Sequence, residues 1–200
     1  MIKNYDNWIK KSCLQINNIY NELDDLDQKV GDGDHGTTIL KGLTKAEKVF
    51  KENIKNPLDE IMLIVAKEMR IVMGGSSGIL MSIFFYESGK INPDNISLSI
   101  VTIFQNTVNK IKKTGKVNIG DKSILDVYEP VLDYLNTSIK IDKNLESINK
   151  IITNSSESTI NMEAKVGRAK FLEKKGLGII DPGAYSTSII LKEFFNSIYK

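Results

Sequence analysis

Three aspartates stand close together near the start of the chain, in a segment that also contains two glycines. Asp27, Asp32 and Asp34 fall within eight residues, and Gly31 and Gly33 keep the segment from continuing as a helix. Like charges at this spacing repel one another, so a bound cation is a natural reason to collect them. Hard oxygen ligands favour Mg²⁺ or Ca²⁺ over zinc. The sequence therefore predicts a divalent-cation site at these three aspartates.

The identity of the cation follows from what the segment lacks. An EF-hand calcium loop needs a glutamate at its twelfth position, and no loop that begins at an aspartate here has one. Magnesium binds a few carboxylates and completes its shell with water and substrate phosphates. A solvated acidic turn is the alternative interpretation, and it suits Asp24 and Asp25 better than the other three. We expect magnesium, with a phosphate ligand nearby.

Two familiar phosphate-binding motifs are excluded. The run GDGDHG (31–36) matches G-x-G-x-x-G, but LDDLDQKV precedes it where a Rossmann fold requires a strand. Its two internal aspartates would also repel a pyrophosphate unless a metal intervened. Residues 115–123 resemble a Walker A loop with one residue too many, again without a strand before them. Neither strand-based nucleotide fold is expected.

Few other side chains are candidates for chemistry. His35 is the only histidine, so a histidine metal cluster is excluded, and no plausible Ser-His-Asp or Cys-His set is present; we expect His35 to orient a phosphate or the loop. Arg168 is a candidate phosphate clamp because a guanidinium binds phosphate in a bidentate way, although a surface arginine is the simpler interpretation. Arg70 is expected to be structural. Cys13, the only cysteine, can form neither an internal disulfide nor a zinc site.

The elements that position these residues are predicted to be helices. Apolar residues recur at three- and four-residue steps almost throughout, and Asn-Pro and Asp-Pro pairs begin new helices. The expected helices are 5–23, 37–53, 57–73, 77–88, 93–115, one from about 121, 145–174 and one from 182. Residues 95–103 are the only candidate strand. The predicted fold is all-α, a bundle of eight antiparallel amphipathic helices.

Glycine-rich connections alternate with plain turns along this bundle. The first, third, fifth and seventh connections contain GDGDHG (31–36), GGSSG (74–78), TGKVNIGD (114–121) and GLGIIDPG (176–183). The turns near Asn56-Pro57, Asn92-Pro93 and Ile141–Asn144 form the even set. Odd connections of an up-and-down bundle share one end, so the glycine-rich loops should meet on one rim. Glycine loops and helix N-termini bind phosphate, which makes this rim the expected functional end.

Bulk composition fits one soluble globular domain, residues 1–200. The chain is 41% hydrophobic and 26% charged, with a formal net charge of +2. The lysines are scattered among acids, so no nucleic-acid partner is expected. The N-terminal segment lacks the apolar stretch of a signal peptide, and no run is long enough to span a membrane. A cytoplasmic protein with no membrane partner is expected.

An ordered set of motifs resembles a known family. LDQKVGDGDHGT, GGSSG, TGKVNIGDKS, LDVYEPVLD, AKVGRAKFL and IIDPGAYSTS resemble, in order and spacing, the L subunit of dihydroxyacetone kinase. The resemblance covers about Asp24 to Ser188. It implies a barrel of eight antiparallel helices with the nucleotide at one end. A fatty-acid kinase relative is disfavoured, because its loop typically reads PDGDTGTN.

The resemblance also implies roles for individual residues. Asp27, Asp32 and Asp34 would hold two Mg²⁺ ions that bridge the phosphates of ADP or ATP. The implied nucleotide contacts are His35, Gly36, Thr37, Thr38, Ser76, Ser77, Gly115, Ile124, Arg168, Asp181, Pro182 and Gly183. Ile124 stands where the family often has methionine, and Ser77 is a stronger candidate than Ser76. No catalytic residue is implied with certainty, and Arg168 is a candidate phosphate clamp.

Partners are implied by what the chain lacks. In this family the substrate carbonyl is bound covalently by a histidine of a separate K subunit, and the lone histidine here lies in the metal loop. The resemblance therefore implies a kinase half-enzyme whose ADP is rephosphorylated by a phosphotransferase M subunit, with a transcriptional regulator as a further partner. The alternatives are a subunit of an ATP-dependent triose or tetrulose kinase, and a nucleotide-loaded regulatory binding module.

Overall fold

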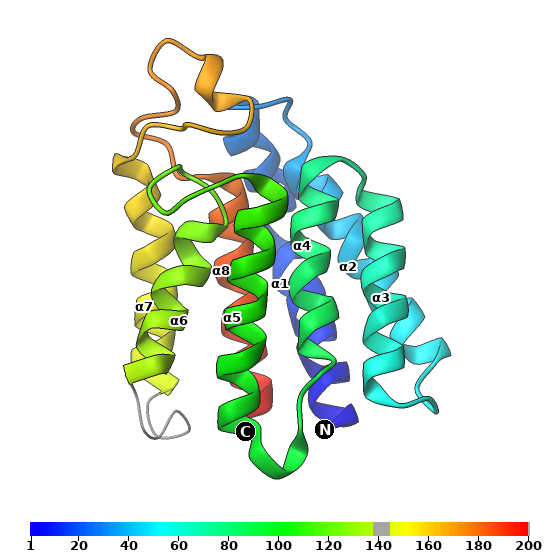
Figure 1. The fold of residues 1–200 in the computed structure, drawn as a ribbon. Helices are drawn as coiled ribbons and strands as arrows, with labels where there is room; N and C mark the ends of the chain where they lie inside the picture. Colours follow the sequence, from blue (N-terminus) through cyan, green and yellow to red (C-terminus); the bar gives the residue numbers. More distant parts are fainter. Residues whose placement is uncertain (138–144, 200) are drawn as a thin grey trace.

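The structure is a computed structural model that describes residues 1–137 and 145–199, and within these residues it is all-helical (Figure 1). The helices are α1 Ile2–Gln28, α2 His35–Glu52, α3 Leu58–Met73, α4 Gly75–Ser88, α5 Ile96–Gly115, α6 Leu125–Thr137, α7 Leu145–Ser158 and α8 Pro182–Ile198. The expected all-α class is confirmed. The candidate strand at 95–103 was wrong, since it forms the start of α5. The turn predicted at Ile141–Asn144 lies outside the described residues.

The eight helices form a closed barrel. Each helix packs against the next along the chain, and α8 packs against α1, which closes the ring. Both termini lie at one end of the barrel, and the connections after α1, α3, α5 and α7 lie at the other (Figure 1). The predicted antiparallel arrangement is therefore confirmed. Helices α2, α4, α6 and α8 all begin at the end that holds the glycine-rich connections.

Aromatic side chains fill the barrel. Trp8 of α1 stacks on Phe85 of α4 at a centroid distance of 4.7 Å and meets Phe84 and Phe194 edge-on. The indole Nε1 donates a hydrogen bond of 3.0 Å to the carbonyl of Ile190, so the one polar atom of the ring is paired. This core joins opposite walls of the barrel. Among residues 1–137 and 145–199, no helix has the length and apolar character needed to cross a bilayer.

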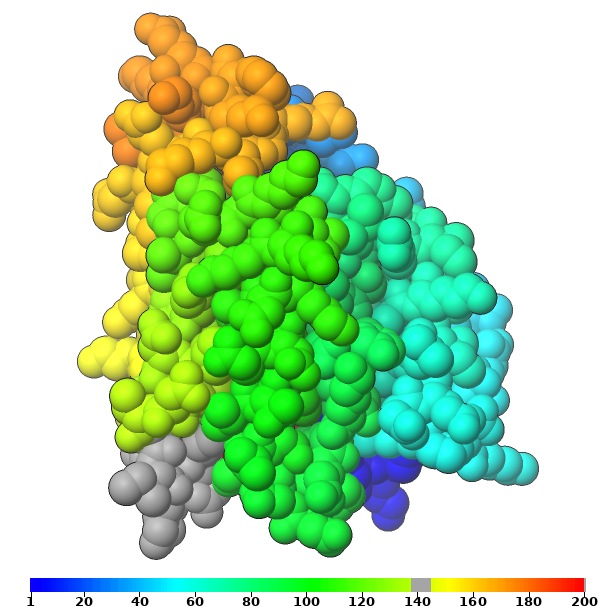
Figure 2. Space-filling model, viewed as in Figure 1, coloured from blue at the N-terminus to red at the C-terminus, as the bar shows by residue number. Residues whose placement is uncertain are grey.

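The seventh helix is shorter than the sequence predicts. It ends at Ser158 rather than near residue 174, and only two short 3-10 turns, Thr159–Asn161 and Ala169–Phe171, follow before α8. Gly167 and Gly176 have positive φ angles of 66° and 71°, which interrupt a helix. The resulting loop, residues 162–180, stands above the rim of the barrel and is called the cover loop below (Figure 2).

Among the other helix boundaries that differ from the expectation by a few residues, two lie at the rim. Helix α1 continues beyond residue 23 to Gln28, so Asp27 belongs to its last turn rather than to a loop. Helix α6 begins at Leu125, because Lys122 before it adopts a left-handed backbone with φ 62°. The first difference places Asp27 on a helix end, and the second leaves Lys122 in the connection before α6.

Candidate metal centre and pocket

The three aspartates predicted to bind a cation are brought together. Asp27 lies in the last turn of α1, and Asp32 and Asp34 follow in the connection to α2; residues 27–34 are called the acidic loop below. One carboxylate oxygen of each lies within 4.8 Å of the others. A cluster of three carboxylates without histidine or cysteine is a donor set for a hard divalent cation. The observed grouping therefore fits magnesium.

Asp27 also organises the backbone of the acidic loop. Its Oδ2 accepts hydrogen bonds from the amides of Gly33 (2.9 Å) and Asp34 (3.1 Å). Gly33 has φ 80°, a conformation that favours glycine. A Cβ atom at Gly31 would lie 2.3 Å from Oδ1 of Asp27, so any side chain there would displace the carboxylate. Both glycines are needed for the three carboxylates to converge.

His35 is buried where the acidic loop meets α2. Its Nε2 lies 2.9 Å from the hydroxyl of Ser186 on α8, which fixes the ring between two helices. Burial lowers the pKa of His35, although the charges of Asp27, Asp24 and Asp34 oppose this effect. A neutral imidazole is therefore favoured at this position. Its pairing with Ser186 supports the expected role of orienting the loop.

The residues after His35 are placed differently from the expected phosphate contacts. Gly36 packs against α1, where a Cβ atom would lie 2.0 Å from the carbonyl oxygen of Tyr20. Thr37 donates from both its amide (2.9 Å) and its hydroxyl (2.6 Å) to the carboxylate of Asp24. Gly36, Thr37 and Thr38 do not line the pocket at the rim. Of the three, Thr37 uses its amide and its hydroxyl to join α2 to α1.

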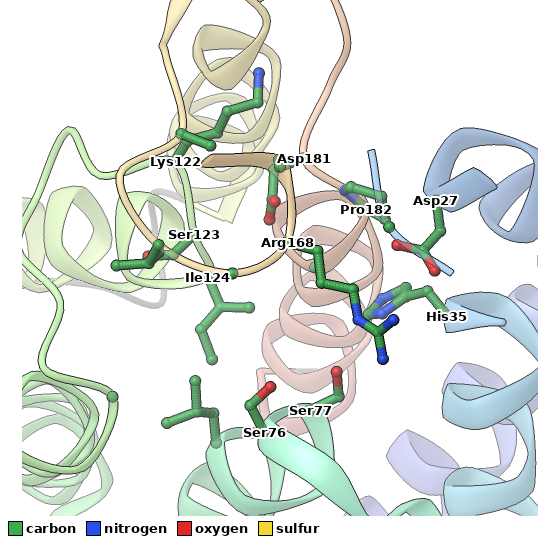
Figure 3. A pocket seen from close by; sticks show the side chains of 18 of the residues that line it. Asp27, His35, Ser76, Ser77, Lys122, Ser123, Ile124, Arg168, Asp181 and Pro182 are labelled. Atoms are coloured by element: carbon green, nitrogen blue, oxygen red, sulfur yellow. The ribbon is translucent and has the colours of Figure 1, made fainter. Parts of the chain in front are cut away.

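A pocket of about 420 Å³ lies beside the acidic loop and is lined from all four glycine-rich connections. It brings together most of the predicted ligand contacts: Asp27, Asp32, His35, Ser76, Ser77, Gly115, Ile124, Arg168, Asp181, Pro182 and Gly183. Figure 3 shows the guanidinium of Arg168 between the serines of α4 and the side chains of His35 and Asp27. Residues distant in the sequence thus share one cavity.

The pocket has one anion-binding side and one apolar side. Ser76 and Ser77 lie in the first turn of α4, and no described side chain caps that turn. The amide groups of this turn and the positive end of the helix dipole therefore face the pocket, and no described side chain caps them. The apolar lining is Ile39, Leu80, Val117, Ile124 and Val166. The cavity suits a ligand with an anionic end and an apolar body.

The cover loop places its arginine over the acidic loop. Nη2 of Arg168 lies 2.7 Å from Oδ2 of Asp32. Both side chains are partly solvent-exposed, so this ion pair contributes little to stability. A guanidinium held at this point can bind a second oxyanion with its remaining donors.

The last connection ends in a buried cap. Asp181 accepts a hydrogen bond of 2.8 Å from the amide of Ala184 and so caps α8, as the Asp-Pro pair predicts. Burial raises the pKa of Asp181 to about 6, although this hydrogen bond and the charge of Lys122 act to lower it. Pro182 and Gly183 follow at the pocket wall.

Sequence reasoning missed Lys122, which is 3% exposed and lies beside the pocket. Its Nζ donates to backbone carbonyls of the segment 159–179. It also missed Asp126, which accepts hydrogen bonds from the amides of Gly120 (2.5 Å) and Ser123 (2.7 Å) and shapes the connection before α6. Burial raises the pKa of Asp126 in spite of these bonds. Lys122 lies within the motif TGKVNIGDKS, but local sequence gave no signal for its hydrogen bonds, because its partners are far along the chain.

Comparison with known proteins places this site in a family context. The DAK2 domain model matches residues 29–196. A probable dihydroxyacetone kinase of Dictyostelium discoideum is 37% identical over 92% of this chain and 31% of its own length. The ADP-binding subunit of a PEP-dependent dihydroxyacetone kinase of Listeria innocua is 32% identical over 84% of this chain and 82% of its own.

A solved structure has the same fold. The dihydroxyacetone kinase of Citrobacter freundii, in complex with AMP-PNP and Mg²⁺, superposes with a TM-score of 0.72 at 26% identity over 96% of this chain. The match covers 33% of that kinase. The chain thus spans about a third of the D. discoideum and C. freundii proteins and most of the L. innocua subunit.

Proposed function

The chain belongs to the DAK2 domain family, and from this premise we propose that it is the nucleotide-binding subunit of a dihydroxyacetone kinase. In this proposal residues 1–200 form one domain that holds Mg-ADP or Mg-ATP at the rim. Acting as a phosphotransferase, it passes the γ-phosphoryl group to dihydroxyacetone on a separate K subunit. The observation that carries the proposal is the convergence of three carboxylates beside a pocket lined by uncapped helix amides.

Asp27, Asp32 and Asp34 would hold the magnesium, for which two ions are expected. When bound, the metal neutralises phosphate charge and so lowers the cost of phosphoryl transfer. The protein contributes positioning: the acidic loop is held rigid by the hydrogen bonds that Asp27 accepts. No described residue of the pocket is an obvious general base, since the only histidine is buried and paired with Ser186.

The nucleotide would lie with its phosphates toward the acidic loop and its base toward the apolar lining. The first turn of α4 supplies amide and hydroxyl donors from Ser76 and Ser77. Arg168 supplies guanidinium donors from the cover loop, above the side chain of Asp32. Ile124 forms part of the apolar wall. Donors aimed at a phosphate from preorganised backbone stabilise developing charge without further rearrangement.

The phosphate donor is proposed to be a phosphotransferase M subunit that rephosphorylates bound ADP, in the cytoplasm. The similarity to the L. innocua PEP-dependent subunit, over most of its length, supports this form. A transcriptional regulator is a further proposed partner. The alternative is an ATP-dependent triose or tetrulose kinase, which the similarity to the D. discoideum and C. freundii kinases would suit. Exchange of bound ADP for free ATP at rates fast enough for turnover would favour this alternative.

Calorimetry of Mg-ADP binding tests the assignment. Asp32→Asn and Asp34→Asn should each weaken binding by at least about tenfold, because each removes a charged ligand from the metal. Asp25→Asn is the matched control, since Asp25 is an exposed acid near the end of α1 and outside the cluster. Unchanged affinity in both site variants would refute the metal assignment. Phosphorylation of dihydroxyacetone with K and M subunits added then separates a kinase from a binding module.

A further inference from the structure

The cover loop is attached to the barrel at few points, yet it carries a large part of the pocket wall. Val166, Gly167, Arg168 and Ala169 all line the pocket. The two legs of the loop bond to each other, through the amide of Ala164 and the carbonyl of Lys175 (2.9 Å). Such bonds close the loop on itself but do not fix its position over the rim. The contacts with the barrel must do that.

One buried ammonium group makes several of those contacts. Nζ of Lys122 lies within hydrogen-bonding distance of four backbone carbonyls, three on the two legs of the loop and one in the 3-10 turn just before it. These are Thr159 (2.6 Å), Met162 (3.2 Å), Gly176 (2.8 Å) and Ile179 (2.6 Å). An ammonium has three protons, so at least one is shared between two carbonyls. Hydrogen bonds from a charged donor are stronger than neutral ones, and burial strengthens them further.

The surroundings of Lys122 are shaped for this contact. The residue has φ 62°, and a Cβ atom at Gly176 would come within 3.4 Å of Cε of Lys122. The preceding residue adds a second attachment: the carbonyl of Asp121 accepts from the amide of Lys165 (3.1 Å), and its carboxylate pairs with Nζ of the same lysine (3.2 Å). The connection before α6 thus binds the cover loop from below.

We propose that Lys122 is a positioning residue that fixes the cover loop so that Arg168 stands over the acidic loop, and thereby sets how slowly bound nucleotide is released. Figure 3 shows the side chain of Lys122 pointing away from the serines of α4 and from Arg168. Although Lys122 is among the residues that line the pocket, its ammonium group bonds to carbonyls of the loop, so its proposed effect on the ligand is exerted through the loop. The effect on release rests on the proposed function; the hold on the loop does not.

The test compares two lysines that share a left-handed backbone, Lys122 (φ 62°) and Lys175 (φ 44°). Lys122→Met removes the four bonds, whereas Lys175→Met removes only an exposed pair with Glu163. Hydrogen exchange in the ligand-free proteins should show lost amide protection in the cover loop for Lys122→Met alone. Release of a fluorescent Mg-ADP analogue, chased with excess ATP, should quicken roughly tenfold for Lys122→Met and stay unchanged for Lys175→Met.

Each result of these experiments either supports or overturns the proposal. If the role of Lys122 is purely structural, Lys122→Met should have a lower melting temperature. The amide protection of the loop relative to the core, and the rate of nucleotide release, should then stay at wild-type values. That result overturns the proposal. If Lys122→Met does not fold, Lys122→Arg replaces it. The wider guanidinium cannot reach all four carbonyls, so faster loop exchange and release are expected, and wild-type values in both overturn the proposal. Failure of the wild-type protein to bind Mg-ADP would contradict the proposed function, while the exchange experiment would still test the hold on the loop.

Discussion

Arg168 of the cover loop and Asp32 of the acidic loop form an ion pair with 2.7 Å between Nη2 and Oδ2. The two residues are far apart in the sequence, and the pair joins the segment before α8 to the segment after α1. It also occupies a carboxylate that is proposed to bind magnesium. The arginine and the cation therefore compete for Asp32. For this reason a change at Arg168 should affect the binding of Mg²⁺ and the binding of the nucleotide differently.

Replacing Arg168 should affect the two ligands differently. In Arg168→Met, Mg²⁺ alone should bind no more weakly than to the wild type, because a competing positive charge has been removed. Mg-ADP should bind roughly tenfold more weakly, since a charge-assisted contact with phosphate is lost. The free energy of unfolding should change by less than about 1 kcal/mol, as expected for an exposed pair. Calorimetry with each ligand and urea unfolding provide the three values.

Lys170→Met is the control for Arg168, because it removes a cation from the same loop outside the pocket lining. Its Nζ lies over the ring of Phe171 at 4.9 Å and contacts no acid of the cluster. It should leave both affinities unchanged. Equal loss of Mg-ADP affinity in the two variants would show that general positive charge, rather than Arg168 itself, binds the nucleotide.

The apolar wall should contribute to nucleotide affinity but not to metal affinity. Ile124→Thr places a hydroxyl where the pocket is apolar, and we expect Mg-ADP to bind three- to tenfold more weakly, roughly the effect of losing about one methylene contact. Binding of Mg²⁺ alone, measured by calorimetry, should not change. Ile119→Thr makes the same change at a half-exposed position of the same connection and should affect neither ligand. A loss of Mg²⁺ affinity in Ile124→Thr would mean that Ile124 contributes to metal binding, which contradicts this prediction.

Stability at low pH should depend on Glu87 of α4, whose side chain is fully buried. Burial alone would raise the pKa of Glu87, but hydrogen bonds from Lys110 and Lys90 (3.0 Å) and their charges outweigh it, so the pKa lies below its ordinary value. A lowered folded pKa gives stability that is present above the ordinary glutamate pKa and is lost as pH falls through the folded one. Glu87→Gln should therefore be less stable than wild type at pH 7, by about 1–3 kcal/mol.

Urea unfolding of Glu87→Gln and wild type between pH 7 and pH 3 measures this dependence. The difference in free energy of unfolding between the two proteins should narrow as the pH falls below about 4.5, the ordinary pKa of glutamate. Glu52→Gln, at an exposed surface pair with Lys48, should show almost no gap at any pH. A gap for Glu87→Gln that stays constant down to pH 3 would mean that its carboxylate charge does not stabilise the fold.

Much of the candidate site was accessible from local sequence. Asp27, Asp32 and Asp34 lie within one short segment, so their convergence required only a turn, and Gly31 and Gly33 signalled one. Helical periodicity and the alternation of glycine-rich and plain connections predicted that distant loops meet at one end. An up-and-down barrel has no other arrangement for them, and the pocket lining agrees.

Other features depended on contacts that no local pattern encodes. The segment after Ser158 has residues compatible with a helix, yet the carbonyl of Met162 accepts from Lys122, and the carbonyl of Thr159 accepts both from Lys122 and from the amide of Met162 in a 3-10 turn. Similarly, the hydroxyl of Thr37 was available in the sequence for a phosphate, but in the structure it donates a hydrogen bond to the carboxylate of Asp24 on the neighbouring helix. In each case the hydrogen bond is made with a residue from another element, which no local pattern indicates.

From the sequence alone, then, came the helical class, the acidic cluster and the end of the barrel where a phosphate ligand would bind. These rest on spacing within a few turns of chain, where the geometry of a helix or a glycine turn is enough to bring side chains together. The cover loop, the place of Arg168 and the role of Lys122 were decided by the tertiary structure. The bonds of Lys122 join residues 37 to 57 positions apart. Only the closed barrel brings such residues within about 3 Å of one another. Burying the charge of Lys122 without these hydrogen bonds would be costly, so the arrangement is specific.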